Sequence, residues 1–277
     1  MNFKVITLFP EMVLNLAKFG VVGRAIDEKL ASLEVLNPRD FSNDPNRRID
    51  DRPYGGGPGM VMQFEPLQKT IQKARENISR KNISQENISQ ANFRSGNKST
   101  EDKPATRVIC LSAQGKPFQH CDIERLSAYE SVILIAGRYE GIDERLIEAE
   151  VDEEISIADI VVSGGELPAM MMLDALIRHI PGALGHEESA QQDSFVDGLL
   201  DCPHYTRPES ILSHKESAQD LSVPDVLLEG DHQAIKKWRE KQSLGRTFQR
   251  RPDLIEKLDL NDEQKALLQE YIQEHQN

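Results

Sequence analysis

Residues 131–181 read SVILIAGRYEGIDERLIEAEVDEEISIADIVVSGGELPAMMMLDALIRHIP, and the rest of the chain is interpreted outward from them. Their first segment, 132–136, is apolar on both alternating faces and ends at Gly137, which is typical of a buried strand in a parallel sheet. Directly after it, residues 137–145 place an aromatic side chain and a carboxylate between two glycines. Open α/β sheets bind ligands at the carboxyl ends of their strands. The segment therefore predicts a ligand-binding loop.

The second half of this region predicts two more loops. Alternation over 156–162 predicts a strand, which ends at the sequence SGGELP. The paired glycines Gly164 and Gly165 permit positive φ and close backbone approach to a ligand, and Pro168 fits the first turn of a helix over 169–179. Single glycine pairs are usually only turns. Here we expect three loops to converge, at Leu111 and Ser112, at 137–141 and at 156–165.

The remaining segments predict an α/β domain followed by helices. We expect strands over 4–9, 33–36 and 107–112, and helices over 10–30 and 122–129. The long polar connection 37–60 lacks the Lys-Ser/Thr ending of a phosphate-binding loop. Two helices are predicted near the C-terminus, over 231–242 and 261–274, each with a capping residue at its start. The predicted domains are 1–181, with a flexible Asn-Ile-Ser-rich insertion at 76–104, a linker at 182–198, and a small all-helical domain at 199–277.

Composition limits the class of protein. No apolar run approaches the roughly 18 residues of a membrane span, so we expect a cytoplasmic protein. Three cysteines without CxxC spacing argue against disulfides and structural zinc. The net charge of −13 alone argues against nucleic acid, but residues 236–252 carry seven cations against the single anion Glu240, a local charge of +6. A solvated helix face is the ordinary explanation. Because Trp238 and Phe248 lie among these cations, the segment also fits an RNA-contacting element.

Five ordered motifs extend over nearly the whole chain. They are LFPEM at 8–12, DDRPYGGGPGM at 50–60, GRYEGIDER at 137–145, SGGELPA at 163–169 and LLDCPHYTRP at 199–208. In this order they resemble the bacterial tRNA (guanine-N1)-methyltransferases, a family of the SPOUT methyltransferase class. The resemblance implies a parallel α/β sheet with a deep trefoil knot, a homodimer with its active site at the subunit interface, and S-adenosylmethionine as methyl donor. It also implies magnesium dependence, although no cluster of ligands in the sequence specifies a metal site.

The chemistry of the expected reaction calls for a base and a cation. Guanine N1 carries a proton at neutral pH, so a base must remove it while a cation stabilises the charge that moves onto O6. By resemblance, Asp193 is that base, Arg178 is that cation and Glu140 helps to position the base or the donor. From the residues alone, a solvated linker aspartate and an exposed arginine ion pair are the more common explanations. The substrate is expected to be guanosine 37 of tRNAs in which another guanosine precedes it.

The resemblance also assigns the binding residues. Those expected to bind the donor, largely through backbone groups, are Leu111, Ser112, Gly137, Tyr139, Glu140, Gly141, Ser156, Ile157, Ala158, Ile160, Val162, Gly164, Gly165 and Pro168. Those expected to bind tRNA are Gly59, Asp201, His204, Arg207 and Trp238. The chain departs from the family pattern at Cys110, Ala113, Ala158 and Ile160, where an aromatic residue, proline, glycine and tyrosine are usual. These departures concern adenine stacking and donor affinity.

Other functions are weighed against this one. A SPOUT ribose 2′-O-methyltransferase would share the knot and the donor, but the motifs at 50–60 and 199–208 favour the guanine enzyme. A base methyltransferase with a cysteine nucleophile would need an activated thiol, for which Cys202 is the candidate, although a structural cysteine is more common. A non-catalytic RNA-binding module would keep the basic segment without binding the donor. A dinucleotide dehydrogenase is disfavoured because no GxGxxG follows the first strand.

Overall fold

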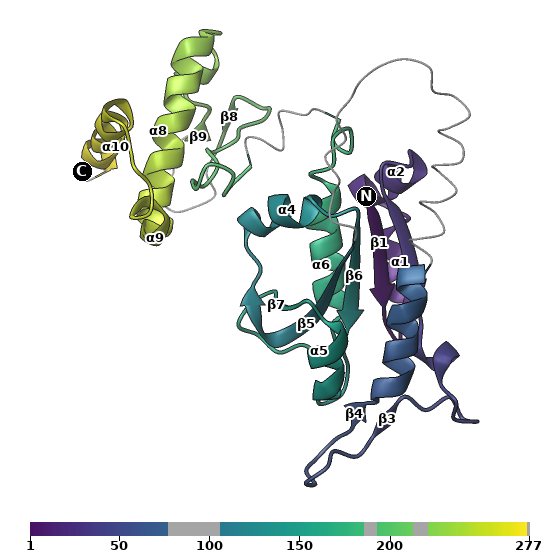
Figure 1. Ribbon diagram of the computed structural model, residues 1–277. Coiled ribbons are helices and arrows are strands. Elements are labelled where there is room, and N and C mark those ends of the chain that lie inside the picture. Colours follow the sequence, from purple (N-terminus) through teal and green to yellow (C-terminus); the bar gives the residue numbers. More distant parts are fainter. Residues whose placement is uncertain (77–105, 186–192, 213–220, 276–277) are drawn as a thin grey trace, which may run out of the picture. The chain divides into compact units, whose positions relative to one another are not determined.

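The computed structural model describes residues 1–76, 106–185, 193–212 and 221–275 (Figure 1). The chain divides into two compact units, Met1–Ala190 and Gln191–Asn277. The predicted insertion at 76–104, apart from its first residue, lies outside the described residues, as does 186–192 of the predicted linker. In the described part of the chain, no helix is long and apolar enough to cross a membrane.

A five-stranded sheet forms the centre of the first unit. Its strand order is β2-β1-β6-β5-β7, and every pairing in it is parallel. The strands are β1 (Asn2–Ile6), β2 (Ser32–Leu36), β5 (Thr106–Pro117), β6 (Ser131–Ala136) and β7 (Glu153–Ser156). All six residues of β6 are buried, because this strand has neighbours on both edges and helices on both faces. The predicted parallel sheet is thus confirmed.

Helices cover both faces of the sheet. On one face, Val132 and Leu134 of β6 share a core with α1 (Pro10–Leu16), α2 (Gly20–Asp27), α4 (His120–Ser127) and α6 (Glu166–Ile177). On the other face, Ile133 and Ile135 share a core with a helix over residues 64–76 and with α5 (Glu144–Glu150). Because successive side chains of a strand point to opposite faces, the apolar run of β6 supplies both cores.

The strand register brings parts of three strands together at one edge of the sheet. Leu111 of β5 is paired with Ala136 at the end of β6 and with Ile155 near the end of β7. Beyond Leu111 the register of β5 against β7 shifts, and Lys116 becomes the partner of Ile155. Gly115 lies in this shift, and a Cβ there would lie 2.5 Å from the backbone of Ile155. The carboxyl ends of β6 and β7 and the part of β5 where its register shifts, just after Leu111, therefore lie at the same edge of the sheet.

Two predicted elements are wrong. The helix predicted over 10–30 is two helices, α1 and α2, because Gly20 adopts a φ of +62° at the start of the second. The strand predicted over 156–162 ends at Ser156, since the hydroxyl of Ser156 and the amide of Ile160 both donate to the Ala158 carbonyl and turn the chain. Residues 158–163 are consequently exposed.

In its described residues, the second unit contains three helices, α8 (His232–Arg250), α9 (Pro252–Ile255) and α10 (Asp262–His275), and the 3-10 turn η2 (Asp225–Leu227). The predicted caps are confirmed: Asp231 accepts from the first turn of α8, and Asn261 and Gln264 form reciprocal hydrogen bonds at the start of α10. A short antiparallel pair, β8 (Ser210–Ile211) and β9 (Leu221–Ser222), was not predicted. The prediction of an exclusively helical unit is wrong in this detail.

Candidate active site

The two glycines before α6 lie against the end of β6. The amide of Gly165 donates to the carbonyl of Gly137 at 2.9 Å, and a Cβ on Gly165 would lie 2.7 Å from the Ala136 Cα. A Cβ on Gly164 would overlap the Nε of Arg138. Neither glycine has positive φ. The expectation that these glycines adopt positive φ is therefore wrong. In the structure, both glycines leave room for other atoms of the protein, those of Ala136 and Arg138.

The loop after β6 is held in an unusual backbone conformation. Tyr139 has a φ of +62° and Gly141 a φ of +141°, a region that favours glycine. The amide of Glu140 donates to the Met60 carbonyl, and the amide of Met62 donates to the Gly141 carbonyl, both at 2.9 Å. These bonds fasten the loop to the hairpin formed by β3 (Asp50–Asp51) and β4 (Val61–Met62). The loop's shape thus depends on a segment far away in the sequence.

The same hairpin brings one predicted substrate residue to a predicted catalytic residue. A Cβ on Gly59, whose φ is +78°, would overlap the side chain of Glu140. The carboxylate of Glu140 therefore lies over the glycine-rich end of the hairpin, between the expected donor loop and the expected substrate segment. The sequence alone does not predict this contact, because Gly59 and Glu140 are more than eighty residues apart in the chain.

Sequence reasoning missed a buried polar cluster that joins these loops. The carboxylate of Glu166, at the start of α6, is fully buried and pairs with Arg138 at 2.8 Å. Its other oxygen accepts from the hydroxyl of Thr7 at 2.8 Å, directly after β1. Arg138 also donates to the carbonyl of Ser163 at 3.0 Å. The sequence did contain a signal for this cluster, because Arg138 and Glu166 are charged residues within the two glycine motifs at 137–145 and 163–169.

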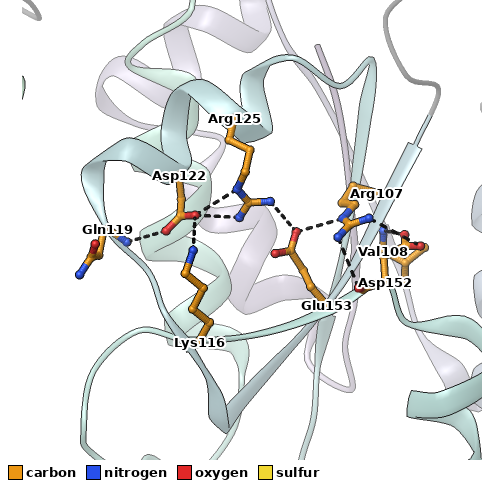
Figure 2. A network of polar contacts seen from close by, with 8 residues as sticks. All are labelled: Arg107, Val108, Lys116, Gln119, Asp122, Arg125, Asp152 and Glu153. Atoms are coloured by element: carbon orange, nitrogen blue, oxygen red, sulfur yellow. Dashed lines mark hydrogen bonds and ion pairs between the residues drawn. The ribbon is translucent and has the colours of Figure 1, made fainter.

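A second polar network links α4, β5 and β7 (Figure 2). Glu153 of β7 accepts from Arg125 of α4 at 2.9 Å and from Arg107 of β5 at 3.0 Å. Arg125 also donates to the buried Asp122, which accepts from the Gln119 amide as well. Partial burial raises the pKa of Glu153, but the hydrogen bonds and charges of the two arginines outweigh burial and hold that pKa below its ordinary value.

Most of the expected donor residues lie either at the carboxyl edge of the sheet or on the turn after β7. Leu111, Ser112, Gly137, Ser156, Gly164 and Gly165 lie at the shared carboxyl edge, as the strand register and the hydrogen bond between Gly137 and Gly165 show. Ile157 packs against the core, whereas Ala158, Ile160 and Val162 are exposed on the turn after β7. Pro168 lies in the first turn of α6.

The two principal catalytic candidates lie in different units. Arg178 follows α6 in the first unit and is partly exposed. Asp193 lies in the second unit, where its carbonyl accepts from the Val196 amide at 3.4 Å. Residues 186–192, which lie between Arg178 and Asp193 in the chain, are outside the described ranges.

The second unit brings together the other expected tRNA residues. His204 pairs with Asp201 at 2.7 Å, and the rings of Tyr205 and Trp238 lie 6.2 Å apart. His204, Tyr205 and Arg207 line a cleft of about 710 Å³ with Arg239 of α8. This cleft combines cations with an aromatic wall, as sites for nucleic acid do.

One group of side chains in the described ranges could ligate a metal ion, namely Asp201, Cys202 and His204. Thiol and imidazole donors suit zinc, whereas magnesium requires oxygen ligands. Burial raises the pKa of the Cys202 thiol, and the neighbouring Asp201 carboxylate raises it further. The group therefore does not fit magnesium, and its thiol is not activated as a nucleophile.

Two of the seven cations along α8 and its C-terminal end serve the protein's own structure. Lys241 pairs with Glu274 of α10 at 2.7 Å, and Arg251 pairs with Asp253 at 2.8 Å. The other five form no ion pair with any residue that the structure describes: Lys236, Lys237, Arg239, Arg246 and Arg250. An unpaired row of cations on a protein of net charge −13 is a candidate contact for phosphates.

Comparison with known proteins agrees with this geometry. Residues 1–257 match the family model described as tRNA (Guanine-1)-methyltransferase TrmD. A tRNA (guanine-N(1)-)-methyltransferase of Pseudoalteromonas atlantica is 52% identical over 272 residues, which cover 98% of this chain and 91% of that protein. A protein of the same name from Vibrio vulnificus is 50% identical over 270 residues, which cover 98% of this chain and 96% of that protein. Another, from Halorhodospira halophila, is 52% identical over 271 residues, which cover 98% of this chain and 91% of that protein. The chain belongs to the tRNA (guanine-1)-methyltransferase TrmD family.

Proposed function

We propose that this protein methylates N1 of guanosine 37 in tRNA, using S-adenosylmethionine as the donor, in the cytoplasm. The observation that carries the proposal is the meeting of three strands and two glycine loops at one edge of a parallel sheet, in a chain of this family. Bound there, the donor supplies an electrophilic methyl group on a sulfonium centre. Backbone groups around Leu111, Gly137, Ser156 and Gly165 hold and orient it.

In the proposed mechanism, Asp193 takes the proton from guanine N1, which frees the lone pair that attacks the methyl carbon. Arg178 donates hydrogen bonds to O6 and stabilises the negative charge that moves there as the proton leaves. Glu140, over Gly59, positions the base or the donor. Asp201, Cys202 and His204, the candidate ligand group among the described residues, do not fit magnesium, so no step is assigned to them as metal ligands.

A homodimer would complete this site, with Asp193 acting on a donor held by the partner subunit. Exposed apolar side chains on the first unit support this assembly, since such patches usually mark interfaces. Leu167 and Met171, one turn apart on α6, are 49% and 58% exposed, and Leu14 on the adjacent α1 is 41% exposed. The deep trefoil knot belongs to the same proposal.

The second unit is proposed to bind the tRNA. The row of unpaired cations on α8 and the cleft beside Trp238 support this role, because they combine charge for phosphates with aromatic surface for bases. The two units would then divide the work, with donor binding in the first and most of the tRNA binding in the second. The same proposal includes that the modified tRNAs have a guanosine directly before guanosine 37.

Methyl transfer from labelled S-adenosylmethionine to a tRNA transcript tests the proposal. We expect incorporation at guanine N1, and none when adenosine replaces guanosine 37. Asp193→Asn should lower the rate by on the order of 10²-fold or more without changing donor affinity. Asp197→Asn, four residues away and exposed, is the matched control and should keep full activity.

Three results would contradict the proposal. Label on the ribose would indicate the 2′-O-methyltransferase alternative. A wild-type chain that binds tRNA without binding the donor would be a non-catalytic RNA-binding module. Undiminished activity in Asp193→Asn would leave the substrate assignment standing and remove the assigned base.

A further inference from the structure

The pair formed by Arg138 and Glu166 lies where three loops of the first unit meet. Arg138 belongs to the loop after β6, Glu166 to the start of α6, and Thr7 to the segment after β1. Glu166 is fully buried and Thr7 is too, so this is a polar contact inside the protein. A buried carboxylate is costly unless charge and hydrogen bonds compensate it. Here an arginine and a hydroxyl do so, together with its place in the first turn of a helix.

Arg138 uses its whole guanidinium group. Nε and Nη2 donate to one oxygen of Glu166 at 2.9 and 2.8 Å, and Nη1 donates to the carbonyl of Ser163 at 3.0 Å. The group also lies 4.5 Å from the centre of the Phe9 ring, a distance at which cation–π attraction acts. A lysine could not make this set of contacts, because it lacks the planar fork.

These contacts fix the two glycine loops relative to each other. The side chain of Arg138 crosses over Gly164, where any Cβ would overlap it, and its backbone amide donates to the sulfur of Met62 at 3.3 Å. Tyr139, the next residue, is held at positive φ. The loop over 137–141 and the loop over 163–166 are thereby joined through one side chain.

We propose that Glu166 is a positioning residue for the methyl donor, because by holding Arg138 it keeps these two loops in the shape that binds S-adenosylmethionine. The inference rests on the proposed function in assigning the donor to these loops. It adds that donor affinity depends on Arg138 and Glu166, two side chains that take no part in the chemistry. Backbone hydrogen bonds fasten the loop over 137–141 to the β3–β4 hairpin and join Gly165 to Gly137, and the pair adds a side-chain link between the two loops.

The test compares donor and tRNA affinity in Glu166→Gln, which keeps the shape and removes the charge. Calorimetry on the full chain, well below each variant's Tm, should show the Kd for S-adenosylmethionine raised by about tenfold or more, as expected when a hydrogen bond to a charged group is removed. The Kd for tRNA should stay within about twofold, because cation contacts elsewhere dominate it. Arg138→Lys should behave like Glu166→Gln.

The matched control is Glu150→Gln. Glu150 is also a largely buried carboxylate of the first unit, and it accepts from Arg75 at 2.6 Å and from Gln68 at 3.0 Å. It lies on α5, outside the loops, so this substitution should lower Tm and leave the donor Kd unchanged. A donor Kd in Glu166→Gln that moves no more than in this control overturns the inference.

A double variant separates positioning from simple stabilisation. Replacing both partners, as Arg138→Met with Glu166→Leu, removes the buried charges together and should restore much of the Tm. If the pair positions the loops, donor affinity stays low in this variant. Recovery of donor affinity along with Tm would overturn the inference while leaving the proposed function intact. A wild-type chain that binds no donor would overturn both.

Discussion

The three cysteines differ in their surroundings. Cys110 is buried in β5, where burial raises its thiol pKa to about 12, and the charges of Glu154 and Glu144 add to this. Cys202 is buried and its pKa is raised as well. Cys121 is exposed on α4. The thiolate is the reactive form, and the raised pKa values disfavour it at Cys110 and Cys202. Cys121 is the exposed cysteine that a reagent in solution reaches directly.

Thiol labelling therefore should be selective. At about pH 8 a maleimide should modify Cys121 quickly and the other two cysteines far more slowly. Peptide mass spectrometry over time measures each rate, and Cys121→Ser should abolish the fast phase. Fast labelling of Cys202 in the folded protein would contradict this, and would revive the alternative in which that cysteine is the nucleophile.

A single glycine sets the distance between two helices of the second unit. A Cβ on Gly245 of α8 would overlap the ring of Tyr271 on α10. In an isolated helix, replacing glycine by alanine stabilises by roughly 1 kcal/mol. Here Gly245→Ala should instead lower the free energy of unfolding by about 1–3 kcal/mol, because the overlap forces the helices apart. Gly185→Ala, whose Cβ would meet no atom of a described residue within 4 Å, is the control in the urea titration.

At the scale of elements, the polar network of Figure 2 links α4, β5 and β7 and depends on pH. Burial raises the pKa of Asp122, but the Gln119 amide and Arg125 outweigh burial and lower it overall, as the arginines do for Glu153. A lowered folded-state pKa means that the stabilisation is present above the unfolded pKa values and disappears as pH falls through the folded ones. The network thus contributes fully at neutral pH.

We expect the free energy of unfolding of the first unit to fall as pH decreases below about 4.5, where these carboxylates begin to take up protons in the unfolded chain. In Glu153→Gln combined with Asp122→Asn, stability should be lower at neutral pH and its decline at acid pH less steep. Denaturant titrations at several pH values measure both. An unchanged acid slope in the double variant would show that other groups govern it.

At the scale of the whole molecule, α8 carries five cations that form no ion pair with any described residue, on a protein of net charge −13. Lys236→Gln with Lys237→Gln should weaken tRNA binding and reduce the slope of log K against log salt by roughly 0.7–0.9 for each phosphate that the protein no longer neutralises. Donor affinity should not change, because the donor loops belong to the other unit. Lys257→Gln with Lys265→Gln removes the same charge from the same unit outside α8. Equal effects of the two pairs would mean that net charge, not the α8 row, controls binding.

Much of this molecule can be read from local sequence patterns. The run of β6 predicts a buried parallel strand, and the sequence around Asn261 and Gln264 predicts the start of α10, because both depend on neighbours within a few residues. The glycine motifs predicted the loops in the right order. Where local signals conflicted with tertiary context, as at Gly20 and after Ser156, prediction failed.

The sequence by itself determined the alternation of strands and helices, the caps, the basic segment and the motifs of the family, since each of these is a property of residues close together in the chain. Only the tertiary structure decided that Gly164 and Gly165 accommodate Arg138 and Ala136, that Glu140 lies over Gly59, and that Glu166 is buried against Thr7. These contacts join residues up to 159 positions apart. They arise because parallel strands place their carboxyl ends at one edge of the sheet, whatever their distance along the chain.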